Sequence, residues 1–484
     1  TSVPIYPNFL TKIYAHFKNT FDITISNKIE NSISVESGSF FFGDPWLVDD
    51  DSDSKGLKNR GVRPLPVEIP YKITPNVTRN SLHKGVFLNQ NPTFDPTKPC
   101  YSVEAISPQD IPLSQTGKSH RFYFQNWTGT NVDFEYANII RTGVVFQDEN
   151  AEASAVLKGA QLSNQSQALS NNGQRKIIRT DDGKLHCVYE SLEKIWYEMS
   201  TDNGNTWVIM NNGQPVSHPA NVAKSPSICL IGNECSILIV YQEKTSGDDF
   251  LTLRSFNYLQ NSSDSLVLFS FGNSYEYDSA PVIDYVSHQD AVNRFLVVWK
   301  YEGNVNNWPD YDPGFYHRKG YLDGAWGDEL NLENDFYPLS ITDENSFNPS
   351  IVKHNIGSDY SFHLVWEQRQ SEYQSEINYA ELREDFTNSM ENSYGEIVVQ
   401  SFYCISDDCG SANNHRPTIT FSSWQPRAGW IGVNPITYMY DAILTTVQPS
   451  RRIYNAYSAG NDDVTSVSIN NASTRYVFAY TRDG

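Results

Sequence analysis

Short alternating hydrophobic segments separated by polar turns run along the chain, and from about Lys176 onward they form a two-part repeat. Each copy opens with a small or polar residue, usually followed by Pro-x-Ile or a close variant. An apolar segment ending in Tyr or Trp begins 13 to 18 residues later. The copies open at Arg175, Ser225, Ala280, Asn348, Arg416 and Ser466, and their aromatic residues are Tyr189, Tyr241, Trp299, Trp366, Trp430 and Tyr480.

This repeat predicts an all-β fold, a β-propeller of six or seven blades. Its period of 50 to 68 residues suits one four-stranded blade with a variable loop and is too long for most helical repeats. The proline fits the start of an innermost strand, where a missing backbone N–H is tolerated. Because the aromatic residues recur in register, we expect them to pack blade against blade.

The last copy ends at Gly484, just after its second strand. A half-made blade leaves open strand edges, which folded proteins avoid. We therefore expect either that the natural chain continues beyond Gly484 or that upstream strands, such as residues 142–146 and 153–157, close the ring.

Residues 1–140 lack the repeat. Their alternating segments, such as residues 22–26 and 121–125, predict strands. We expect an N-terminal β-sandwich-like domain at residues 1–140, followed by the propeller at residues 141–484. The alternative for the N-terminal region is an extended arm.

One turn carries a more specific motif, whose fixed positions are Ser200, Asp202, Gly204, Thr206 and Trp207. Asp202 is expected to accept hydrogen bonds within its own turn, Gly204 to supply a positive φ, and Trp207 to cover the hairpin. The motif resembles the Asp-box of the sialidase superfamily, a turn between the outer strands of a propeller blade. With the repeat, it makes residues 140–484 similar to secreted bacterial propellers of that superfamily.

For sialidase catalysis, the resemblance implies three arginines on the substrate carboxylate, a Tyr–Glu nucleophile pair and an aspartic acid/base. Arg175 stands where the first arginine is expected. However, the usual Arg-Ile-Pro is replaced by Arg175-Lys176-Ile177, and no residue matches the catalytic acid. We therefore do not expect sialidase activity.

A second enzymatic interpretation is polysaccharide lysis, which needs a cation beside the uronate and a His/Tyr pair. Arg175, Arg179, His186 and Tyr189 are close in sequence and are the candidates. Strand alternation places His186 and Tyr189 on opposite faces. The favoured interpretation of His186 is therefore a hydrogen-bonded histidine between blades.

Composition excludes several classes of protein. With 39% hydrophobic and 19% charged residues, the chain is not of the disordered type. A net charge of −21 disfavours binding to nucleic acid. No apolar run approaches the roughly 20 residues needed to span a bilayer. Since Thr1 is not a natural start residue, we expect that a leader has been removed.

Six cysteines form an even set. The spacings of Cys229 with Cys235 and of Cys404 with Cys409 suit disulfides across short turns, which predicts an oxidising compartment. Cys100 and Cys187 would pair only if the fold brings them together. A zinc site is less well supported, because no C-x2-C pair is present.

Two polar segments are candidates for binding. Alternating carboxylates at Asp49, Asp51 and Asp53 would suit Ca²⁺, a hard cation, although a solvated loop explains them as well. A long insertion at residues 306–314 is a candidate binding loop or an ordered surface loop. Its candidate residues are Trp308, Asp310, Tyr311 and Asp312.

We expect a secreted or cell-surface propeller that acts in binding or extracellular assembly. Its partner would be a glycan, an extracellular protein or a copy of itself, and its only cofactor would be Ca²⁺ at the acidic loop. The alternative is a carbohydrate-active enzyme, either a glycoside hydrolase or a polysaccharide lyase. An enzyme needs converging arginines with a carboxylate or a His/Tyr pair at the propeller axis, whereas a binding protein can have a filled axis. The residues at the axis therefore separate the two.

Overall fold

The structure is a computed structural model. It describes residues 23–29, 33–35, 39–43, 65–68, 71–73, 100–113, 118–146, 151–165, 168–169, 173–231, 236–272, 279–287, 293–302, 313–323, 329–332, 337–356, 359–371, 374–385, 396–406, 413–422, 425–433, 440–447, 453–457, 463–472 and 475–483. The chain divides into two compact units, Thr1–Asn164 and Gln165–Gly484. Each unit is described by itself.

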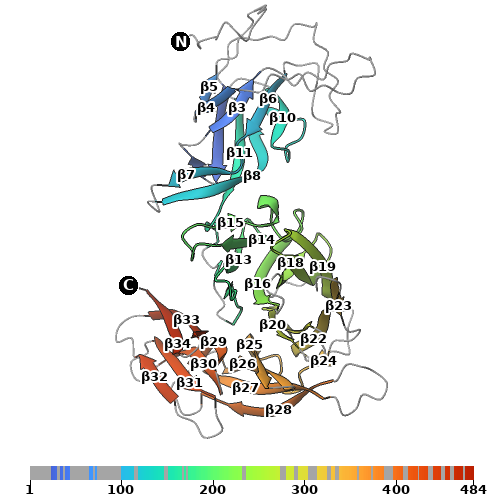
Figure 1. The fold of residues 1–484 in the computed structure, drawn as a ribbon, viewed down its shortest axis with the longest axis vertical. Coiled ribbons are helices and arrows are strands. Elements are labelled where there is room, and N and C mark those ends of the chain that lie inside the picture. Colours follow the sequence, from blue (N-terminus) through green and yellow to red (C-terminus); the bar gives the residue numbers. More distant parts are fainter. Residues whose placement is uncertain are drawn as a thin grey trace, which may run out of the picture. The chain divides into compact units, whose positions relative to one another are not determined.

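The first unit consists of two β-sheets (Figure 1). One has the order β2-β1-β11-β8-β7, with β5 also pairing β1. Its strands are β1 (Ile23–Ile29), β2 (Ile33–Val35), β5 (Tyr71–Ile73), β7 (Gln109–Leu113), β8 (Lys118–Thr130) and β11 (Glu152–Gly159). The other has the order β4-β3-β6-β10-β9. Its strands are β3 (Ser39–Gly43), β4 (Leu65–Glu68), β6 (Cys100–Ala105), β9 (Val132–Phe134) and β10 (Arg141–Phe146).

The two sheets face each other across an aromatic core. Trp127 on β8 is 2% exposed, and its ring stacks on Phe134 of β9 with 6.0 Å between ring centroids. The described strands thus form two packed sheets, as expected of a sandwich-like fold, and are not an extended arm. The unit runs to Asn164, beyond the boundary expected at residue 140, because β10 and β11 pair within its sheets.

The prediction that residues 142–146 and 153–157 close the propeller ring is wrong. These residues lie in β10 and β11, within the first unit. β10 is paired on both sides, by β6 and β9, and β11 is paired by β1 and β8. Neither strand therefore has a free edge to offer to another sheet.

The second unit contains a series of antiparallel groups of strands that follow one another in chain order around a common centre (Figure 1). Two of these groups are joined into one sheet by a single parallel pairing, Ser375 with Asn413. We number the groups as blades. Blade 1 comprises β12 (Ile177–Arg179), β13 (Leu185–Ser191), β14 (Lys194–Ser200) and β15 (Val208–Ile209), and a short 3-10 helix η1 (Asn211–Gly213) follows it. Blade 2 comprises β16 (Val222–Leu230), β17 (Ser236–Lys244), β18 (Asp249–Asn257) and β19 (Ser262–Gly272).

The later blades repeat this order. Blade 3 comprises β20 (Val282–Ser287), β21 (Asn293–Tyr301), β22 (Gly314–Asp323) and β23 (Glu329–Leu332), with β24 (Tyr337–Pro338) also on β22. Blade 4 comprises β25 (Ser346–Ile356), β26 (Asp359–Ser371), β27 (Gln374–Asp385) and β28 (Glu396–Cys404). Blade 5 comprises β29 (Asn413–Ser422), β30 (Gln425–Val433), β31 (Tyr440–Thr446) and β32 (Ile453–Tyr457). A hairpin of β33 (Asp463–Ala472) and β34 (Arg475–Asp483) follows.

The predicted all-β propeller is therefore confirmed. The first strand of each blade neighbours the first strand of the next, from β12 through β16, β20, β25 and β29 to β33. The described part of the chain contains no helix long and apolar enough to cross a bilayer.

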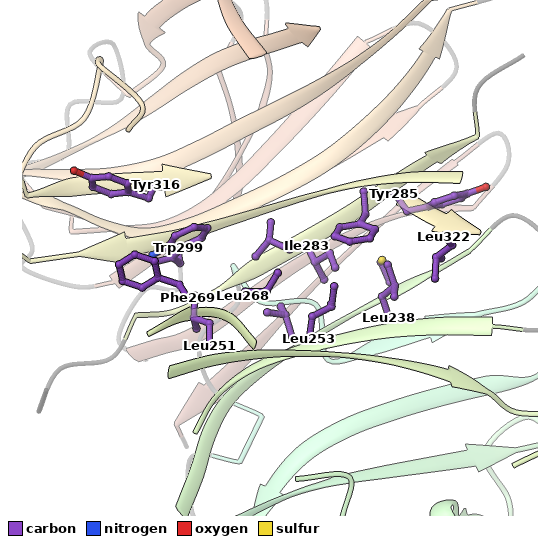
Figure 2. Packing of buried hydrophobic residues seen from close by; sticks show 14 of the residues in the cluster. Leu238, Leu251, Leu253, Leu268, Phe269, Ile283, Tyr285, Trp299, Tyr316 and Leu322 are labelled. Carbon is purple, nitrogen blue, oxygen red and sulfur yellow. The ribbon is translucent and has the colours of Figure 1, made fainter. Parts of the chain in front are cut away.

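Four of the six recurring aromatic residues, Tyr241, Trp299, Trp366 and Trp430, pack between blades, as predicted. Figure 2 shows the core between blades 2 and 3, where Trp299 of β21 lies against Leu251 and Phe269 of blade 2. The other three also face the preceding blade: Tyr241 lies in the core with blade 1, Trp366 in the core with blade 3, and Trp430 in the core with blade 4. Burying an aromatic side chain of this size contributes on the order of 2–3 kcal/mol.

A bend at the start of the inner strands accompanies the repeated proline. In blades 2 to 5 the residue before the proline has a positive φ, from 41° to 56°. These residues are Ser225, Ala280, Asn348 and Arg416. In three of the blades the strand register also shifts here, as in a β-bulge. Non-glycine residues adopt this conformation at a cost of about 1–2 kcal/mol. Its recurrence therefore indicates that the bend has a structural role in each blade.

Candidate functional site

The centre of the propeller is occupied by residues 173–176, which we call the axial segment. An ideal Cβ on Gly173 would lie 2.1 Å from the carbonyl oxygen of Pro349, in blade 4. Gln174 is buried, and its Nε2 donates to the carbonyls of Ser225 (2.8 Å) and Pro281 (2.9 Å), in blades 2 and 3. A segment that contacts three other blades at their inner strands lies on the propeller axis.

Arg175 extends the axial segment to a buried carboxylate. Its Nη2 donates to Asp284 Oδ2 of blade 3 (3.1 Å) and to the carbonyl of Ile351 in blade 4 (3.3 Å). Burial alone would raise the pKa of Asp284, but Arg175 and Lys353 outweigh it and hold that pKa below its ordinary value. The Lys353 backbone N–H also donates to Asp284 Oδ2. Asp284 is therefore an anion paired across the axis.

Lys176 completes the segment. Its Nζ donates to the side-chain oxygen of Gln174 (3.0 Å) and to the carbonyl of Pro226 (2.6 Å). The backbone is held too, since the carbonyl of Arg175 accepts from Ile228 N. The axis thus holds a four-residue segment whose polar side chains bind the inner strands of the surrounding blades.

In three blades, the polar residue that follows the repeated aromatic joins that blade to the next. Glu190 accepts from the backbone N–H of Ser225 (2.6 Å), and Gln242 accepts from that of Ser279 (3.1 Å). Glu367 accepts from that of Arg416 (3.3 Å). The acceptor in each pair lies in one blade and the donor lies beside the bend of the following blade. The bend thus turns a backbone N–H toward the preceding blade, and we call these contacts inter-blade links.

Glu367, which makes one of these links, is hydrogen-bonded by several side chains. Its side chain is fully buried and lies beside Arg369 Nε (2.7 Å), His415 Nδ1 (3.2 Å) and Asn348 Nδ2 (2.8 Å). Burial would raise its pKa, but the hydrogen bonds from His415 and Arg369 lower it to about 2.

Replacing Glu367 by glutamine is expected to destabilise the propeller by about 3 kcal/mol at pH 7, since a shift from 4.5 to about 2 corresponds to roughly that difference. The folded pKa is depressed, so the stabilisation is present above pH 4.5 and is lost as the pH falls toward 2. Urea unfolding at pH 7 measures the cost. Glu376→Gln, at a partly exposed position on β27, is the matched control, and equal losses in both variants would refute the expectation.

The four catalytic candidates from the sequence are not brought together. Arg175 lies on the axis, whereas the Nη2 of Arg179 donates to Asn203 in the turn after β14 (2.8 Å). His186 Nδ1 lies 2.8 Å from the hydroxyl of Tyr197 in the core shared with blade 2. Tyr189 projects from the opposite face of β13 and donates to the carboxylate of Glu198. No His/Tyr acid–base pair is formed by these residues.

The environment of His186 is repeated in blade 4. His363 stands three residues before Trp366, as His186 stands three before Tyr189, and its Nδ1 lies 2.6 Å from the hydroxyl of Tyr379. Burial lowers the pKa of His186 to about 4 and that of His363 to about 3. The recurrence indicates a structural role for both histidines. The sequence carried the signal, because residues 186–190 and 363–367 share the pattern His-x-Val-aromatic-Glu.

The turn at residues 200–207 has the hydrogen bonds expected of its sequence. Asp202 Oδ1 accepts from the backbone N–H of Thr206 and from Ser200 Oγ, both at 2.8 Å, and Asp202 Oδ2 accepts from Thr206 Oγ1 at 2.6 Å. Bonds from Thr206 and Ser200 lower the pKa of Asp202 to about 2. Gly204 has φ +87°, and Trp207 Nε1 donates to its carbonyl. The turn joins β14 to β15, the two outer strands of blade 1.

The predicted disulfides are not seen. Cys187, Cys229 and Cys404 are thiols in this structure. Cys229 is fully buried in the core between blades 2 and 3. In the pairing of β16 with β17 it lies opposite Leu238, and Leu238 is three positions after Cys235 in the sequence. A disulfide across that turn would need a different register.

Several sequence candidates lie outside the described residues. These are Cys235 and Cys409, the acidic residues Asp49, Asp51 and Asp53, and the loop residues Trp308, Asp310, Tyr311 and Asp312. The side chain of Cys100 lies outside them too. Within the described part of the chain, no group of three His, Cys, Asp or Glu side chains is arranged to hold a metal ion.

Comparison with known proteins gives similarity in architecture only. No family model and no curated protein matches the chain. Among solved structures, it is similar to an exo-1,5-α-L-arabinanase from a bovine ruminal metagenomic library, with 10% identity over 58% of this chain and 95% of that one and a TM-score of 0.30. It is also similar to an α-L-arabinofuranosidase from Fusarium graminearum, with 9% identity over 60% and 83% of the two chains and a TM-score of 0.39. A lectin from Aleuria aurantia has 12% identity over 59% and 79%, with a TM-score of 0.33. Similarities this distant do not assign an activity.

Proposed function

We propose that this protein acts by binding, as a secreted or cell-surface propeller that recognises a glycan or an extracellular protein. In this proposal it performs no catalysis at its axis. The turn at residues 200–207 and the blade repeat support its place among sialidase-like propellers, whose scaffold it keeps without the catalytic set.

The observation that carries the proposal is the axial segment. Arg175, the arginine of the axial segment, is already paired with Asp284 at 3.1 Å. Gln174 and Lys176 fill neighbouring positions on the axis with hydrogen bonds to blade carbonyls. A substrate at this position would have to break these contacts before any chemistry could begin.

The proposal is tested by comparing turnover with binding. The protein is incubated with sialosides, uronate polysaccharides and arabinan, while reducing ends and unsaturated products are measured. In parallel, its binding to a glycan array is recorded, with Fucα1-6GlcNAc, the sugar bound by the lectin named above, included.

We expect binding without turnover on one class of glycan or on a protein co-purified from the cell surface. Robust turnover that Arg175→Ala abolishes would overturn the proposal. Arg383→Ala is the control, because Arg383 forms a partly exposed ion pair with Glu381 in blade 4, away from the axial segment.

A further inference from the structure

We propose that the propeller axis is a guanidinium-binding site that the chain fills with its own Arg175, and that an arginine side chain of a partner peptide can take its place. The inference goes beyond the proposed function, because it assigns a ligand chemistry to the propeller axis.

The groups around the axial segment are hydrogen-bond acceptors. Five backbone carbonyls and one carboxylate bind it or abut it, and they come from blades 2, 3 and 4. They belong to Ser225, Pro226, Pro281, Pro349, Ile351 and Asp284. Of these, the Asp284 carboxylate and the Ile351 carbonyl bind the guanidinium of Arg175, whereas the carbonyls of Ser225, Pro281 and Pro226 are bound by Gln174 and Lys176. A guanidinium carries five N–H donors and no acceptor, so its chemistry matches the two acceptors that face it.

The acceptors are held in place by the fold. Four of the five carbonyls belong to the bends at the inner strands: they are those of Ser225 and of the repeated prolines Pro226, Pro281 and Pro349, in blades 2 to 4. The inter-blade links from Glu190 and Gln242 hold the bends of blades 2 and 3 from the preceding blade. The site is therefore preorganised, which lowers the conformational cost of binding a ligand.

Asp284 makes the site selective for a cation. Its side chain is 5% exposed, and Oδ1 accepts from Tyr285 N while Oδ2 accepts from Lys353 N and Arg175 Nη2. Without Arg175, this buried carboxylate would lose its only side-chain hydrogen-bond donor among the described residues. A buried carboxylate left without its partner is costly, so an empty axis would favour any ligand that restores the guanidinium.

Arg175 can be exchanged because only one nitrogen of its guanidinium group makes hydrogen bonds to the described part of the chain. Both hydrogen bonds of its side chain to described residues come from Nη2, and the side chain is 30% exposed. The segment also directly follows the stretch that leads from the first unit, which ends at Asn164. An incoming arginine could therefore engage Asp284 as Arg175 leaves.

The test is chemical rescue of Arg175→Ala. This substitution removes the atoms that ethylguanidinium supplies, and the probe is added while thermal unfolding is followed. We expect Arg175→Ala to have a lower Tm than the wild type, and ethylguanidinium to raise it saturably. Binding should be on the order of tenfold tighter than that of ethylammonium, which lacks the planar donor fork. Arg383→Ala should show no such rescue.

The double variant Arg175→Ala/Asp284→Asn separates a specific site from general stabilisation by a cation, and it should show no rescue. Rescue that persists in the double variant, equal rescue by ethylammonium, or no rescue of a folded Arg175→Ala would each overturn the inference. Should Arg175→Ala not fold, Arg175→Gln takes its place in the same titration. Because the readout is Tm and not turnover, a failed rescue would leave the proposed binding function standing.

Discussion

Gly173→Ala is expected to destabilise the propeller by about 3 kcal/mol or more, near the upper end of the usual cost of overpacking. A Cβ at this position would lie 2.1 Å from the carbonyl oxygen of Pro349. That oxygen belongs to the backbone of another blade, so the clash can be relieved only by moving the axial segment or the inner strand of blade 4. Urea-induced unfolding followed by fluorescence measures the loss.

Gly183→Ala provides the matched control. Gly183 has φ +89° in the turn after β12, and its nearest atom to a new Cβ is Arg179 Nη2 at 3.6 Å. That variant introduces backbone strain of about 1–2 kcal/mol without a clash. A loss at Gly173 no larger than the loss at Gly183 would show that the axis is not packed as described.

The propeller is expected to lose stability steeply as the pH falls from 6.5 toward 4. Burial lowers the pKa of His186 to about 4 and the pKa values of His317 and His363 to about 3, from 6.5 in the unfolded chain. Between these pKa values the unfolded state binds more protons than the folded state. The free energy of unfolding is therefore highest above pH 6.5 and decreases as the pH is lowered. Three such groups give a slope of about 4 kcal/mol per pH unit near pH 5.

Urea unfolding at intervals between pH 7 and pH 4.5 measures this slope. His317→Phe removes one buried titrating group and should reduce the slope by about a third. His218→Gln changes an exposed histidine and should leave it unaltered. Stability that stays constant over this range would show that the histidines are not buried as neutral rings. The stabilisation from Glu367 is lost only below pH 4.5, so it does not contribute to the slope measured between pH 7 and pH 4.5.

The scaffold could be predicted from sequence because blade packing repeats in register. Trp299, Trp366 and Trp430 occupy one position of a repeating unit, and each is buried against the preceding blade. The polar residue after most of the aromatics was visible as a pattern, but its role was not, because its partner lies in the next blade. The link from Glu367 to Arg416 spans 49 positions.

The axial site could not be predicted for the same reason. Arg175 was a candidate, but its partner Asp284 lies 109 positions away, and one aspartate among 57 acidic residues gives no signal of its own. Gly173 and Gln174 carry no motif. Their roles follow from the shape of the ring, which brings distant carbonyls to one point. The disulfide prediction failed because it relied on spacing alone, whereas pairing across a hairpin also depends on register.

The central claim is that the chain fills its own propeller axis through the pairing of Arg175 with Asp284. A double-mutant cycle with Arg175→Gln and Asp284→Asn measures that pairing in solution. The account predicts a coupling free energy of about 1.5–3 kcal/mol, as for a hydrogen bond between charged groups. A coupling of zero within error would contradict it and would leave the axis open to a substrate.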